Sequence, residues 1–102
     1  MMTVNRILLL LAIDILDDNS HGSVVAGLII STTGRHESLR KSVYVTLHRM
    51  RDQGLVDQLR DGKRSSRPWY RMTRRGRNEL LTTLDELEQL GKMARKVLKK
   101  AA

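Results

Sequence analysis

The chain has 102 residues, a length that fits one domain with a small core. It carries 19 Lys and Arg residues against 11 Asp and Glu residues, and the resulting net charge of +8 favours a polyanionic partner, either nucleic acid or an anionic membrane surface. The sequence contains no cysteine, which excludes disulfides and thiolate metal sites and fits a cytoplasmic protein.

The first predicted element is a helix over residues 4 to about 18. Arg6 followed by an apolar run at residues 7–13 imitates a signal peptide, but three aspartates follow and no small-residue cleavage site is evident. The run is also well below the ~20 residues that cross a bilayer. Because the run is apolar nearly all round, we expect a buried helix with more than one neighbour. Its short length and the aspartates after it lead us to expect no membrane association.

Two further helices are predicted. Residues 22–32 form a short helix that ends before Gly34, although its β-branched residues also permit a strand. Residues 38–53 form the third helix and Gly54 ends it. An inward apolar stripe of this helix recurs at spacings of four, four and three: Leu39, Val43, Leu47 and Met50.

A β-hairpin and a long last helix complete the chain. Strands are predicted at residues 55–60 and 69–72, joined by an Asp61-Gly62 turn and a basic tip. We expect one of Trp69 and Tyr70 to pack on the core, and a structural role for Trp69. Thr73 is the expected N-cap of a helix running to about residue 100.

The last helix carries a seven-residue apolar repeat, which predicts a partner helix along its length. We expect this helix to pair two copies of the chain. The dimerisation candidates are Leu80, Leu84, Leu87, Gly91, Ala94 and Leu98. Gly91 is unfavourable inside a helix, so it either admits a second backbone at close range or is a weak point.

Three helices, a hairpin and a long terminal helix, in this order, predict a mainly α fold with a small β-hairpin (α+β). This is a winged helix-turn-helix at residues 1–73 with a dimerisation helix at residues 74–102.

The motifs of residues 7–81 resemble the PadR-like transcriptional regulators. The resemblance lies in Tyr44 and Leu47 before Gly54-Leu55-Val56, in Arg67-Pro68 with residues 69–73 and Gly76, and in His21-Gly22. The chain departs from the family pattern at three positions. The family often has an aromatic residue where this chain has Ser23, a glycine where it has Lys41 and a proline where it has Val45.

A helical wheel separates the third helix into two faces. With the apolar stripe inward, Lys41, Val45 and His48 lie at the centre of the outward face. The alternative is a solvated surface helix, but the basic hairpin that follows and the family resemblance favour contact with DNA. The DNA-binding candidates are Ser38, Arg40, Lys41, Ser42, Tyr44, Val45, His48, Arg49, Lys63, Arg64 and Arg67.

Within this set we expect two kinds of contact. Lys41, Val45 and His48 would read bases, with Arg40 and Tyr44 at the edge. The remaining cations would mainly hold phosphates: Arg49, Lys63, Arg64 and Arg67. Tyr44 has a rival role, because its ring could instead pack on the second helix.

The sequence offers no catalytic constellation and no cofactor motif. His21, His36 and His48 lack the spacing of metal ligands. A small-molecule effector is possible, but the last helix has no aromatic residue to stack on one. The sequence therefore predicts a homodimeric DNA-binding regulator, a repressor on a pseudo-palindromic operator. The alternative is a winged-helix adaptor whose terminal helix pairs with another protein.

Overall fold

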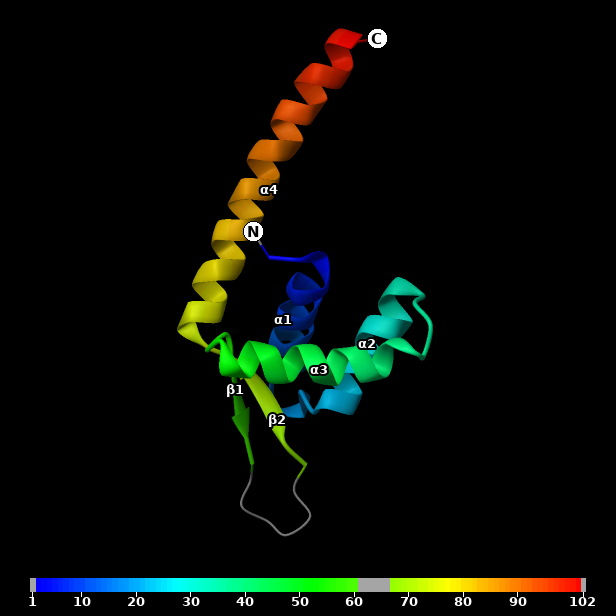
Figure 1. Cartoon of the computed structure of the whole chain (residues 1–102), viewed down its shortest axis with the longest axis vertical. Helices are drawn as coiled ribbons and strands as arrows, with labels where there is room; N and C mark the ends of the chain where they lie inside the picture. The colour runs from blue at the N-terminus through cyan, green and yellow to red at the C-terminus, as the bar shows by residue number, and fades with distance from the viewer. Residues whose placement is uncertain (1, 61–66, 102) are drawn as a thin grey trace.

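The structure, a computed structural model, describes residues 2–60 and 67–101. In chain order the elements are α1 (Val4–Leu16), the 3-10 turn η1 (Asp17–Asn19), α2 (Gly22–Thr33), α3 (Leu39–Asp52), β1 (Val56–Leu59), β2 (Trp69–Met72) and α4 (Arg74–Ala101). This order confirms the predicted mainly α fold with one hairpin, a winged helix with a long terminal helix (Figure 1). The predicted Asp61-Gly62 turn and the hairpin-tip candidates Lys63 and Arg64 lie outside the described residues.

The core lies where α1, α2 and α3 meet the hairpin. α1 contacts α2, α3, β2 and α4, which confirms that this apolar helix has several neighbours. The inward stripe of α3 is also confirmed, with three of its members buried and Leu39 half-buried. The main buried side chains of the three helices are Leu9, Leu10, Ile13, Val25, Ile29, Val43, Leu47 and Met50.

The ends of the helices are set by local hydrogen bonds and by two glycines. The Thr3 hydroxyl accepts a hydrogen bond from the Arg6 amide at 3.3 Å and caps α1. Gly34 and Gly54 follow α2 and α3 with φ angles of 68° and 77°, a conformation that favours glycine. The Thr73 hydroxyl accepts from the Gly76 amide at 3.0 Å, which confirms the predicted N-cap of α4.

The return strand β2 is held along both edges. It pairs antiparallel with β1, with Val56 opposite Met72. On its other edge the Tyr70 amide donates to the Ser20 carbonyl at 3.1 Å, and the buried Ser20 hydroxyl donates to the Tyr70 carbonyl. Tyr70 is the aromatic residue of the core, only 2% exposed, whereas Trp69 is half-buried beside His21. The hairpin is therefore fixed to the start of α2.

α4 begins against the winged helix and then leaves it (Figure 1). Its first turns bury Leu80 and Thr83, and the amide of Met2 donates to the Thr83 hydroxyl at 3.3 Å. From Leu84 onward its large apolar side chains are exposed. The projecting helix makes the molecule 61 Å long but only 30 Å by 20 Å across.

Candidate nucleic-acid interface

The outward face of α3 is open to solvent, as the helical wheel predicts. Lys41, Val45 and His48 are all exposed, Val45 to 49%. Arg49 is exposed beside them. Within residues 2–60 and 67–101, no side-chain hydrogen bond or ion pair engages Lys41, His48 or Arg49. This face thus presents two cations, an imidazole and a small apolar group, the kinds of side chain that contact phosphates and base edges in a major groove.

The start of α3 is arranged differently, because its charges are already paired. The Arg40 guanidinium binds the Glu37 carboxylate at 3.0 Å and donates to the Ser23 carbonyl of α2, also at 3.0 Å. The hydrogen bond and positive charge of Arg40 lower the pKa of the Glu37 carboxyl, and the same pairing raises the pKa of Arg40. Arg40 therefore joins α3 to α2, with its charge largely balanced.

Ser38 and Ser42, the other two polar candidates at the start of α3, are both exposed. Ser38 stands at the N-cap position of α3, but its hydroxyl makes no capping bond and its amide donates to His36 Nδ1 at 3.1 Å. The Ser42 hydroxyl donates to the Leu39 carbonyl at 2.8 Å. A hydroxyl can still accept a hydrogen bond from a ligand while it donates in this way.

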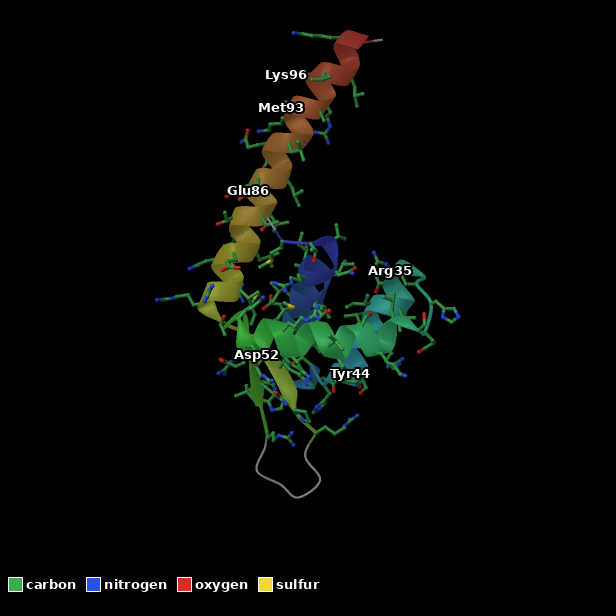
Figure 2. The ribbon with its side chains drawn as sticks, viewed as in Figure 1. Arg35, Tyr44, Asp52, Glu86, Met93 and Lys96 are labelled. Atoms are coloured by element: carbon green, nitrogen blue, oxygen red, sulfur yellow. The ribbon has the colours of Figure 1, made fainter. Side chains whose placement is uncertain are left out.

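The ring of Tyr44 packs against the first residue of α2. A Cβ added to Gly22 would lie only 2.5 Å from Tyr44 Cε1, so the ring occupies space that any larger residue at position 22 would need. Tyr44 remains 38% exposed. The ring thus packs on the start of α2, the structural role considered for Tyr44, which Figure 2 labels on α3.

The base of the hairpin meets the same point of α2. The Arg67 guanidinium donates to the Ser23 hydroxyl at 3.2 Å, and the Pro68 carbonyl lies 3.1 Å from His21 Nδ1. Ser23 therefore accepts from both Arg40 and Arg67, through its carbonyl and its hydroxyl. Sequence reasoning missed Ser23 as a junction residue, and its only signal was its place directly after the His-Gly pair.

Two more cations, Arg51 and Arg77, also have partners within the chain. Arg51 donates to the Gln58 side chain of β1 at 2.5 Å, and Arg77 pairs with Asp14 of α1 at 2.9 Å. Arg71, on β2 opposite Asp57, is exposed and was not among the predicted contacts. The described cations with neither ion pair nor hydrogen bond within these ranges thus include Lys41, Arg49 and Arg71.

The predicted dimerisation residues divide between the body and the projecting part of α4. Leu80 is buried against its own domain, and Gly91 is half-buried. The other four are exposed: Leu84, Leu87, Ala94 and Leu98. The apolar repeat therefore begins inside the domain and continues along the free helix.

No group of three His, Asp or Glu residues comes close enough to hold a metal within the described part of the chain. In the same residues no helix is both long and apolar enough to cross a membrane. A largely apolar groove of about 190 Å³ lies between α1 and α2, and its lining includes Leu8, Leu11, Ile15 and Leu28.

The sequence profile of the PadR-like transcriptional regulator family matches residues 10–82, which is most of the chain and includes all of α2, α3 and the hairpin. The protein belongs to the PadR-like family of transcriptional regulators. The match runs from within α1 through the rest of the winged helix to the first turns of α4, and it confirms the resemblance read from Tyr44, Gly54 and the wing residues.

A solved structure has the same fold as this PadR-like chain. It is the crystal structure of a protein from Thermoplasma acidophilum described as a candidate transcriptional regulator. The two superpose with a TM-score of 0.68 at 21% sequence identity, over 94% of each chain. The likeness therefore includes the long terminal helix as well as the winged helix. No curated protein sequence matches this one.

Proposed function

We propose that this PadR-like regulator is a homodimer that binds operator DNA through α3 and represses transcription by occupying its site. The observation that carries the proposal is the exposed set Lys41, Val45 and His48 on one face of α3, in which Lys41 and His48 have no side-chain partner among residues 2–60 and 67–101. Lys41 and His48 would donate to base edges, and the Val45 side chain would contact a thymine methyl group. Two such helices would enter successive major grooves about 34 Å apart.

The contacts around Ser23 support separate roles for the remaining candidates. Arg49 is exposed and unpaired within the described residues, so it is suited to hold a phosphate. Arg67 lies at the base of the hairpin. Lys63 and Arg64, the candidates at the hairpin tip, would contact phosphates of the DNA backbone. The Arg40 guanidinium already binds the Glu37 carboxylate and the Ser23 carbonyl. We therefore assign Arg40 to holding α3 on α2 rather than to contact with the bases.

Two uncovered apolar surfaces support the dimer. One is the stripe of α4 from Leu84 to Leu98. The other runs along the outer side of α1, where Val4 and Ile15 are 63% and 73% exposed, and it borders the groove between α1 and α2. A second copy could cover both surfaces at once, and large exposed apolar patches mark interaction sites.

Repression would follow from occupancy of the operator. A dimer held there through the outward face of α3 would exclude other proteins from the same site. Neither a catalytic group nor a cofactor is needed for this function.

The test is selection of bound sequences from a random DNA library, with a measurement of molecular mass beside it. Wild type should select a two-fold-related motif as a dimer. Lys41→Ala/His48→Ala should lose the motif while staying dimeric, because neither residue lies near α4. Arg35→Ala, which also removes an exposed cation but one whose guanidinium donates to Asn5 of α1, is the control and should keep the motif.

Two outcomes would contradict the proposal. A monomer that selects no motif would remove both parts of it. A chain that selects no motif but pairs through α4 with a different protein would instead establish the adaptor function.

A further inference from the structure

The start of α2 is bonded both to α3 and to the base of the hairpin, the two elements of the proposed DNA-binding surface (Figure 1). The Ser23 carbonyl accepts a hydrogen bond from Arg40 at 3.0 Å, and the Ser23 hydroxyl accepts one from Arg67 at 3.2 Å. Resting on the DNA-binding function proposed above, we infer that Ser23 is a positioning residue, whose hydroxyl holds the Arg67 guanidinium in place for a phosphate of the bound DNA.

The two arginines have partners of different charge. Arg40 binds the Glu37 carboxylate, so much of its charge is balanced before any ligand arrives. Arg67 is exposed and donates to a neutral hydroxyl, and no ion pair engages it within residues 2–60 and 67–101. A guanidinium has five N–H donors, and the bond to Ser23 uses one donor on Nη1. Arg67 is therefore held in place while it keeps its charge and most of its donors.

The hydroxyl that holds Arg67 belongs to a fixed part of the fold. Ser23 lies in the first turn of α2, where the helix limits the movement of its backbone. Two residues earlier, His21 pairs with Trp69 of β2, and its Nδ1 lies 3.1 Å from the Pro68 carbonyl. Pro68 directly follows Arg67 in the chain. The backbones on both sides of the Ser23–Arg67 hydrogen bond are thus held together by other contacts as well.

A long side chain that is ordered before binding loses less conformational entropy when it binds. An exposed arginine without a partner samples many rotamers, and a phosphate contact would have to fix them. The Ser23 hydroxyl already restricts Arg67 in the free protein. Because this bond has no charge on the acceptor, it is weaker than a bond to a phosphate and does not compete with it.

The same residue also relates Arg67 to the outward face of α3. The carbonyl and the hydroxyl of Ser23 are only a few bonds apart, so Arg40 on α3 and Arg67 at the hairpin base are held at one place on α2. Lys41, a candidate for contact with the bases, directly follows Arg40. A phosphate bound by Arg67 and the bases contacted by Lys41 would therefore be approached by one rigid unit.

A double-variant cycle tests whether Ser23 acts through Arg67. Ser23→Ala removes the hydroxyl and leaves the carbonyl that binds Arg40. The probe is the DNA sequence that the full-length wild type selects from a random library. Ser23→Ala should weaken binding about threefold for each protomer, or about tenfold for a dimer, the effect of ordering one long side chain. In the Arg67→Ala background the same change should have no effect. Ser23→Thr keeps a hydroxyl and should bind like the wild type.

The slope of log K against log salt separates positioning from direct contact. Arg67→Ala should lower this slope by about one per protomer, because a phosphate contact is lost. Ser23→Ala should leave the slope unchanged, since Arg67 still reaches the phosphate. Ser31→Ala is the matched control, because this second serine of α2 is exposed near the other end of the helix and donates to the Leu28 carbonyl at 3.1 Å. It should bind like the wild type.

The results that would overturn the role of Ser23 differ from those that would remove DNA binding. An equal loss from Ser23→Ala with and without Arg67 would mean that the hydroxyl supports the fold of α2 instead. Unchanged binding by Ser23→Ala, or by Arg67→Ala, would also overturn the positioning role and leave a DNA-binding regulator standing. A wild type that selects no DNA sequence would remove the proposed function itself.

Discussion

Gly76, in the first turn of α4, packs directly against the carbonyl oxygen of Leu55, just before β1. A Cβ at position 76 would collide with this backbone oxygen and would also crowd the Met72 side chain. The Thr73 hydroxyl, which caps α4, donates to the Gly54 carbonyl at 2.6 Å. The end of α3, the start of β1 and the start of α4 therefore share one joint, which sets the direction in which α4 leaves the domain.

Replacing this glycine should weaken the joint. We expect Gly76→Ala to lower the free energy of unfolding by about 1–3 kcal/mol, the usual result of overpacking, because a backbone oxygen cannot move aside as a flexible side chain can. Gly27→Ala in α2 is the matched control. A Cβ there meets nothing within 4 Å, so this change should raise stability by about 0.5–1 kcal/mol. Chemical denaturation of both variants checks the difference, and equal effects would contradict it.

The two arginines of α3 should differ in their effect on DNA binding. Arg49→Ala should reduce the slope of log K against log salt by about one per protomer, because a phosphate contact is lost. Arg40→Ala should leave that slope nearly unchanged and weaken binding by a similar factor at every salt concentration. Its partner is Glu37, so no counterion release is lost with it. Titrations at several salt concentrations measure both slopes, and a drop with Arg40→Ala equal to that with Arg49→Ala would show that Arg40 contacts a phosphate.

The Glu37–Arg40 pair should open in acid. The pKa of Glu37 is lowered in the folded chain, so the contribution of the pair is fully present above the unfolded value, roughly 4.3, and is lost as the pH falls through the folded value. NMR titration of the Glu37 carboxyl should show this lowered pKa in wild type. In Arg40→Ala it should rise to the ordinary range, and an unchanged value would show that Arg40 is not its cause.

Gly91 offers a test of how closely the two α4 helices of the proposed dimer approach each other. In a lone helix Gly91→Ala should be favourable by about 1 kcal/mol, since alanine is the better helix former and a Cβ has open space there. If the backbones cross at this point, the same change should instead weaken the dimer while raising the helix content of the monomer. Circular dichroism below and above the dimerisation range distinguishes the two effects. A tighter dimer would mean that the helices do not meet closely at Gly91.

Much of the fold could be read from the sequence, because the interactions that define it act within a few residues. The stripe from Leu39 to Met50, the glycine stop at Gly54 and the Thr73 cap depend on helix period and on bonds to nearby amides. The outward set Lys41, Val45 and His48 follows from the same period. The apolar repeat of α4 is likewise a property of the sequence alone.

Only the tertiary structure decided which of these residues are already engaged. Arg40 and Arg67 lie 17 and 44 positions from Ser23, and nothing in their local sequence indicates that both bond to it. The choice of Tyr70 over Trp69 for the core likewise depends on the pairing of β2 with Ser20. Such contacts are made by segments far apart in the chain, so they follow from how the helices and hairpin pack. Periodicity determined which face of α3 points outward, and packing determined which of its charges are free to bind.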